Sequence, residues 1–243
     1  MIYLNLTILI FLLVAIQSIM GVGVLVVGTP LLLLFNYNII EAMAILLPIS
    51  IITSGLNLMY FKKIKKKFNL KLNKKIKKNF FYICLPFIFI GVTLLKIFKD
   101  IVNFEILVAI VILVSVLINV NKNIAYNFSD KLKKIILALI GIIHGFTNSG
   151  GSLLSLFISN QSNKNNSRYN ITYFYLFLAL SQFLIFIFFF GIDVFHLFEV
   201  YMILSISLGV LVGNFFFNFV NEKMFKVIIN IICILTSIIL LTK

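Results

Sequence analysis

Two glycine-rich interruptions of long apolar runs decide the fold: QSIMGVGVLVVGTP at residues 17–30 and GIIHGFTNSGGS at residues 141–152. Glycine allows the backbone to leave the helical ladder and lets a ligand approach it closely. Non-helical backbone inside a bilayer is tolerated only where protein buries it or where it lines a cavity. One interruption opens the chain and the other opens its second half. Breaks at corresponding positions of two halves are typical of transporters with discontinuous helices.

The composition around these breaks indicates lipid as the main solvent. The chain has 243 residues, of which 62% are hydrophobic and 12% are charged. A soluble domain is about 45–50% apolar and about 25% charged. The composition therefore excludes a soluble enzyme, a disordered chain and a secreted disulfide scaffold. Runs such as residues 106–118 are apolar on every face, whereas barrel strands alternate. We therefore predict an all-α polytopic membrane protein.

Hydropathy divides the chain into about eight spans, since each spanning helix needs about 20 residues. The spans cover about residues 2–35, 39–61, 80–98, 104–120, 135–158, 171–190, 197–219 and 225–241. The first and fifth contain the glycine interruptions, so we predict that both are broken or re-entrant. The two related transmembrane halves are expected at residues 1–121 and 122–243.

Basic residues predict the orientation. The chain carries 21 basic and 7 acidic residues, and ten of the basic ones lie between Lys62 and Lys78. If every segment crosses once, 15 basic residues lie on one side and six on the other, which places both termini in the cytoplasm. The expected location is the bacterial inner membrane. The Lys62–Lys78 stretch is either a solvated loop or an amphipathic helix that contacts anionic lipid, and no motif favours nucleic acid.

The residues expected to line a substrate path lie mainly in the two interruptions, because a new half-helix offers free N–H groups and a positive dipole end to an anion. They are Gln17, Ser18, Gly21, Gly23, Pro30, His144, Gly145, Asn148, Ser149, Gly150 and Gly151, together with Gln182 in the sixth span. His144 is either a proton carrier or a neutral side chain bonded to a neighbouring helix. Arg168 is either a gate for an oxyanion or an interfacial anchor. The alternative role for the glycines is close helix packing.

At these residues the sequence resembles the sulfite exporter TauE/SafE family. The run from Gln17 through Gly21, Gly23 and Pro30 to Glu41-Ala42 looks like the family's first signature. Gly141, Gly145 and Ser149-Gly150-Gly151, followed by Arg168, look like the second. The resemblance implies a permease for small anions, often sulfur-containing ones such as sulfite or sulfonates.

The function predicted from these observations is secondary transport of a small anion by alternating access, with the anion between Gly21–Pro30 and Gly145–Ser152. The alternative is a non-transporting membrane scaffold whose glycines serve packing. Neither a phosphate-binding loop nor a metal-ligand motif is found in the sequence, so we expect no enzyme activity, cofactor or metal. The sequence leaves the oligomeric state open.

Overall fold

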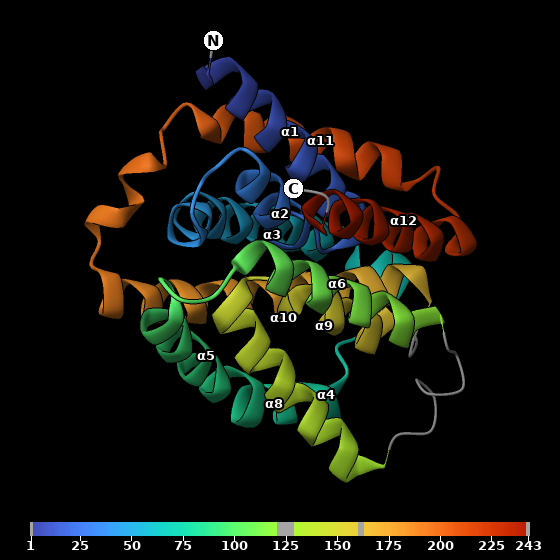
Figure 1. Ribbon diagram of the computed structural model, residues 1–243. Coiled ribbons are helices and arrows are strands. Elements are labelled where there is room, and N and C mark those ends of the chain that lie inside the picture. Colours follow the sequence, from blue (N-terminus) through green and yellow to red (C-terminus); the bar gives the residue numbers. More distant parts are fainter. Residues whose placement is uncertain (1, 121–128, 160–162, 242–243) are drawn as a thin grey trace.

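A computed structural model describes residues 2–120, 129–159 and 163–241, and every regular element in these ranges is a helix (Figure 1). The α-helices are α1 (Ile2–Met20), α2 (Val24–Leu34), α3 (Ile39–Phe68), α4 (Lys74–Asn79), α5 (Leu85–Phe98), α6 (Phe104–Val120), α8 (Asp130–Thr147), α9 (Gly150–Ser159), α10 (Lys164–Phe190), α11 (Met202–Phe217) and α12 (Glu222–Leu241). A π-helical turn, Phe80–Cys84, joins α4 to α5, and a 3-10 turn, Asp193–Leu197, precedes α11. The all-α prediction is confirmed.

The two glycine-rich segments break their helices, as predicted, and each break turns the chain back on itself. A Cβ atom at Gly23 would lie 2.9 Å from the backbone N of Gln17, and one at Gly28 would lie 3.1 Å from Leu13 Cδ1. The helix α2 therefore runs antiparallel to the end of α1. At the second break, a Cβ atom at Gly150 would lie 2.6 Å from both the carbonyl oxygen of Ile140 and Cβ of His144. The helix α9 thus turns back onto α8.

The first and second parts of the chain interlock through exchanged helix pairs. Figure 1 shows the α1–α11 pair at one edge of the molecule and the α5–α8 pair at the other, with α3 and α10 between them. The helix α3 also packs on α10, and α6 pairs with α12. Glycines make the close approaches possible: Gly209 and Gly213 face α1, and Gly91 of α5 faces α8. The predicted boundary at residues 121 and 122 lies outside the described residues.

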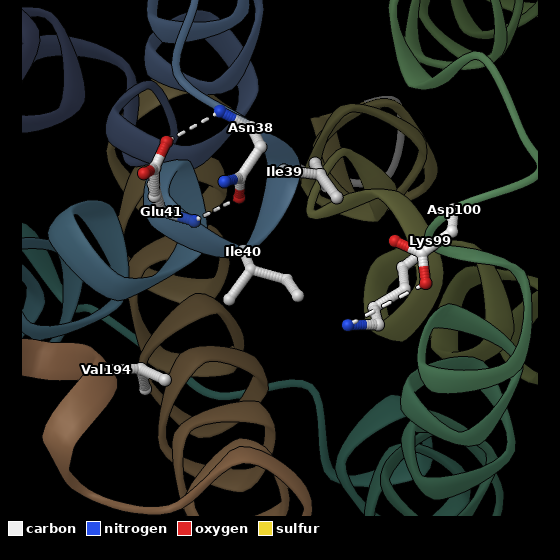
Figure 2. A pocket seen from close by; sticks show the side chains of 7 residues that line it. All are labelled: Asn38, Ile39, Ile40, Glu41, Lys99, Asp100 and Val194. Atoms are coloured by element: carbon white, nitrogen blue, oxygen red, sulfur yellow. Dashed lines mark hydrogen bonds and ion pairs between the residues drawn. The ribbon is translucent and has the colours of Figure 1, made fainter.

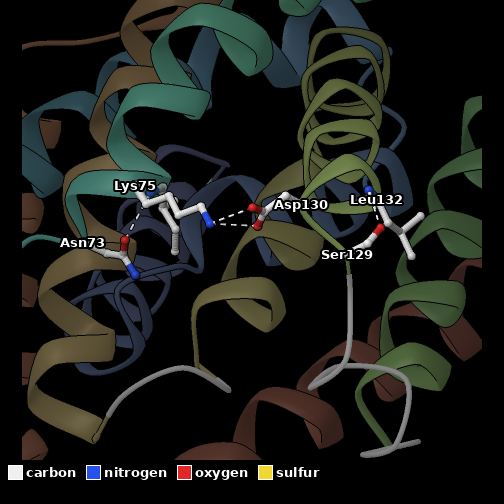
Figure 3. Close-up of polar contacts among 6 residues, drawn as sticks. Asn73, Lys75, Ser129, Asp130 and Leu132 are labelled. Atoms are coloured by element: carbon white, nitrogen blue, oxygen red, sulfur yellow. Dashed lines mark hydrogen bonds and ion pairs between the residues drawn. The ribbon is translucent and has the colours of Figure 1, made fainter.

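Several helix ends meet on one side of the molecule, which we call the lysine face: the end of α3 and the starts of α4, α8 and α10. The backbone N of Lys71 donates to Asn166 Oδ1 at 2.9 Å. Figure 3 shows Lys75 Nζ, which donates to both carboxylate oxygens of Asp130 at 2.8 Å. Ser129 caps the start of α8 by accepting from the Leu132 N–H. The Lys62–Lys78 stretch is therefore the last two turns of α3, a short connection and α4.

The Lys75–Asp130 pair predicts a small acid-sensitive contribution to stability. Lys75 lowers the pKa of Asp130 below its ordinary value of 3.8 by hydrogen bonding and charge. The stabilisation is therefore complete above the unfolded-state pKa and is lost as the pH falls through the lower folded-state pKa. We expect Asp130→Asn to lower the detergent melting temperature slightly and equally from pH 7 to about pH 5. The difference from wild type should vanish in stronger acid; a difference that grows there would contradict the assignment.

The opposite face gathers the start of α3 and the ends of α5 and α10. Asn38 and Glu41 form a capping box, with reciprocal hydrogen bonds of 2.8 and 2.9 Å that start α3 (Figure 2). A cavity of about 260 Å³ lies beside this box, and Lys99, Asp100 and Val194 complete its lining. Glu41 therefore serves the helix start.

Three described helices are long and apolar enough to cross a membrane: Ile39–Lys66, Lys74–Phe98 and Lys164–Phe190. Shorter apolar helices lie at Leu6–Met20, Val24–Leu34, Phe104–Val114 and Met202–Phe217. These lengths are consistent with a polytopic membrane protein. They do not establish the eight crossings expected from hydropathy, because α2 and α9 have only 11 and 10 residues and both fold back.

Candidate functional site

The first break depends on two glycines for different reasons. Gly21 has φ +82°, the left-handed region that side chains disfavour, and a Cβ atom there would lie 3.0 Å from the Arg168 carbonyl oxygen. Gly23 instead permits the close approach to α1 described above. Pro30, expected to mark the interruption, lies inside α2, which continues to Leu34. The break is therefore at residues 21–23.

Gln17 ties the first break together. Its side chain is fully buried, and its Oε1 accepts from the Val24 N–H at 3.0 Å, which caps the start of α2. Its Nε2 donates to Ser54 Oγ at 3.0 Å and to the Ser50 carbonyl at 3.3 Å. The Gln17 side chain thus links α1, the start of α2 and the middle of α3 through buried hydrogen bonds.

Tyr175 of α10 lies between the two breaks. Its hydroxyl accepts from the Leu25 N–H at 3.1 Å, and its ring lies against Gly151, where a Cβ atom would collide with it. Tyr175 therefore touches the second residue of both α2 and α9. Sequence reasoning missed it, because a tyrosine in an apolar run has the same pattern as a packing residue. Only its partner across 150 positions of the chain distinguishes it.

The second break turns at Asn148, which has φ 62° and ends α8. Its Nδ2 donates to Thr29 Oγ1 of α2 at 2.9 Å, and both residues are fully buried. This hydrogen bond confirms the expectation that the two interruptions approach each other. Ser149 makes these hydrogen bonds with residues close in sequence: its hydroxyl donates to the Thr147 carbonyl, and its own carbonyl accepts from the Ser152 hydroxyl.

Three buried side chains near the second break have polar atoms without a hydrogen-bond partner in the described part of the chain. They are both ring nitrogens of His144, Oδ1 of Asn148 and Oε1 of Gln182. Gln182 Nε2 donates to the His144 carbonyl at 3.1 Å, which brings Gln182 to this break as well. An unpaired buried polar group costs about 1–3 kcal/mol. Such a cluster in an apolar interior is a place where water, a proton or an anion would be stabilised.

Two predicted residues serve other contacts. A Cβ atom at Gly145 would collide with the Ile88 carbonyl of α5, so this glycine permits the packing of α8 on α5. Ser18 Oγ accepts from Asn57 Nδ2 at 2.9 Å, next to the first break. Ser18 is therefore linked to α3, and Gly145 fits the packing role that the sequence left open.

Arg168 is buried on the lysine-face side of the first break. Its Nη2 donates to Asn214 Oδ1 at 2.6 Å, and its guanidinium carbon lies 4.1 Å from the Phe217 ring centroid and 4.8 Å from that of Phe61. With 1% of its surface exposed, it is not an anchor at the interface. The role of a gate stays a prediction.

The comparison with protein families identifies the chain. The model of the sulfite exporter TauE/SafE family matches residues 6–240. The chain belongs to this family. The match runs from within α1 to within α12 and covers both breaks. It makes the chain a member of a family of membrane transporters for sulfite or related anions. Neither the curated proteins nor the solved structures gave a match.

Proposed function

We propose that this TauE/SafE family member is a secondary transporter that moves a small oxyanion, such as sulfite or an organosulfonate, by alternating access. The observation that carries the proposal is the meeting of two broken helices at Thr29 and Asn148, beside unpartnered polar atoms of His144, Asn148 and Gln182. A scaffold would gain nothing from unpaired polar groups at this depth.

The start of α2 supports a specific binding mode. Its first two N–H groups, those of Val24 and Leu25, donate to Gln17 Oε1 and Tyr175 Oη. Both acceptors are neutral side-chain oxygens. An oxyanion could replace them, since a helix N-terminus stabilises negative charge. In this proposal the two side-chain oxygens occupy the places that the oxygens of a bound anion would take.

His144 is the group best placed to couple a proton to the anion. It is fully buried, its ring nitrogens have no partner among the described residues, and its carbonyl is held by Gln182. Protonation there would supply a positive charge close to the breaks. Without coupling, a neutral imidazole would serve as a hydrogen-bond donor to the anion.

The hairpin geometry supports a different membrane topology from the one expected from hydropathy. The hairpin of α1 and α2 enters and leaves the membrane on the face opposite the lysine face. The hairpin of α8 and α9 enters and leaves it on the lysine face. Leaving aside Lys122 and Lys243, which lie outside the described residues, 17 of the other 19 basic residues belong to segments near the lysine face. We therefore propose six crossings, a cytoplasmic lysine face, and both termini on the non-cytoplasmic side.

Cysteine labelling tests this topology at two exposed positions. In a variant without native cysteines, Asp193→Cys should react with an impermeant maleimide added outside bacterial cells, because the end of α10 faces outwards. Asn221→Cys should react only after permeabilisation, because the start of α12 lies at the lysine face. Eight single crossings predict the reverse pattern at both positions, so that result would overturn the proposal.

We also propose that the protein lies in the bacterial inner membrane, that the two halves are related repeats, and that Lys62–Lys78 contacts anionic lipid. Exchange of helix pairs between the halves supports the second of these, because α1 pairs with α11 as α8 pairs with α5.

Counterflow in proteoliposomes tests the transport function. Vesicles would be loaded in turn with sulfite, sulfate, thiosulfate and short sulfonates, with and without a pH gradient. We expect saturable exchange of at least one anion. Gln182→Leu should reduce the rate of exchange about tenfold or more, because it removes a polar contact to a charged ligand. His144→Gln should remove any dependence on the pH gradient. No exchange of any anion by folded protein would contradict the proposal.

A further inference from the structure

Arg168 and Lys164 lie one helical turn apart on α10 and line the same cavity at the lysine face. The cavity has a volume of about 200 Å³, and aromatic rings of Tyr60, Phe61 and Phe217 form much of its wall. Lys164 Nζ lies 5.0 Å from the Phe217 ring centroid, and the Arg168 guanidinium stacks on the same ring. The cavity therefore presents two cations and no acidic side chain in its lining.

The charge of Arg168 is not compensated. Its only described hydrogen bond goes to a neutral amide, its Nε has no partner, and no described carboxylate lies within ion-pair distance. A buried, unpaired guanidinium is costly unless an anion accompanies it. Two like charges one turn apart add repulsion. Both costs fall when an oxyanion accepts from the free Nε, since the planar guanidinium matches oxyanion geometry.

A chain of buried amides leads from Arg168 to the first break. Asn214 Nδ2 donates to Asn57 Oδ1 at 2.9 Å, and Asn57 Nδ2 donates to Ser18 Oγ at 2.9 Å. Ser18 lies three residues before Gly21. A second cavity, of about 570 Å³, is lined in part by Asn214 and shares Tyr60 and Asn218 with the first. The polar chain thus begins between two cavities and ends at the proposed transport site.

We propose that Arg168 and Lys164 form an oxyanion-binding site at the lysine face, separate from the breaks, where the transported anion is held before it moves along Asn214, Asn57 and Ser18. The identity of this anion rests on the proposed function. The binding site itself does not, because any group with the same chemistry fits it, including the phosphate of an anionic lipid.

Binding can be measured without transport, because the chain contains no tryptophan. Tyr60→Trp would place a single fluorophore in the cavity wall. The purified full-length variant would be titrated with sulfite, sulfate and methanesulfonate in lipid-free detergent, and separately reconstituted in nanodiscs of phosphatidylcholine with or without phosphatidylglycerol. We expect a saturable fluorescence change with at least one small anion in detergent. A change only with phosphatidylglycerol would support the site and assign it to a lipid headgroup.

Three variants in the Tyr60→Trp background test the role of Arg168. Arg168→Gln should weaken binding about tenfold or more, and Arg168→Lys should restore part of it. Asn214→Asp tests the site even if Arg168→Gln fails to fold. The new carboxylate should pair with Arg168 and therefore compete with the anion. Equal affinity in Arg168→Gln and the parent, or no saturable response to any anion or lipid, would overturn the site. Saturable binding without counterflow would contradict only the transport function, and normal counterflow by Arg168→Gln would overturn only the loading role.

Discussion

The Gly150→Ala protein is expected to exchange anions at less than about a tenth of the wild-type rate, with a free energy of unfolding lowered by about 1–3 kcal/mol. One added methyl group would lie 2.6 Å from both the Ile140 carbonyl oxygen and His144 Cβ. Because one neighbour is backbone, α9 must move away from α8. This movement displaces Asn148 and Gly151, which connect the second break to Thr29 and Tyr175. Counterflow and a denaturant melt in detergent measure the two effects.

Gly55→Ala is the matched control for this change. Gly55 lies inside α3, and a Cβ atom there meets nothing within 4 Å. The same substitution should therefore leave exchange unchanged and stability equal or slightly higher, since alanine favours a helix over glycine. A Gly150→Ala protein that exchanges anions as fast as Gly55→Ala would refute the role of the second break.

Tyr175→Phe is expected to bind the transported anion about 5- to 150-fold more tightly than wild type while exchanging it more slowly. The substitution removes only the hydroxyl that accepts from the Leu25 N–H. That buried N–H then lacks a partner, at a cost of about 1–3 kcal/mol to the unliganded protein. An anion bound at the start of α2 would remove this cost, so binding strengthens and release slows. Equilibrium binding and counterflow, measured side by side, separate affinity from rate.

Tyr173→Phe provides the comparison on the same helix. Tyr173 is half-buried, packs its ring on Phe177 and faces Lys77, so its contacts survive the loss of the hydroxyl. We expect wild-type affinity and rate. If Tyr175→Phe lowers stability but binds the anion with wild-type affinity, the anion does not bind at the start of α2.

The sequence by itself determined the solvent, the helical class and the places where helices break. These properties are local. Apolar runs longer than a soluble domain can bury require lipid, and glycine-rich segments such as 21–23 permit a turn whatever surrounds them. The two motifs also sufficed to indicate the family that the match over residues 6–240 establishes.

Only the tertiary structure decided what each break contacts. Hydropathy treats residues 2–35 as one long span. It cannot detect that α2 returns along α1, because a helix that continues straight and a helix that folds back bury the same apolar side chains. Pro30 illustrates the limit: proline disrupts a helix on average, yet here the helix continues past it. The interlocking of α1 with α11 likewise depends on glycines nearly 200 positions away.

The polar residues divide in the same way. Gln17, His144, Asn148 and Gln182 were recognisable from sequence, because a polar side chain in an apolar run must find a partner or a function. Tyr175 was not, since its ring suits the apolar run and only its hydroxyl marks it. Which polar groups are satisfied, as Gln17 is, and which are left open, as His144 is, depends on hydrogen bonds between helices distant in sequence. Hydrogen bonds act over about 3 Å, so only the packed arrangement of α2, α8 and α10 decides them.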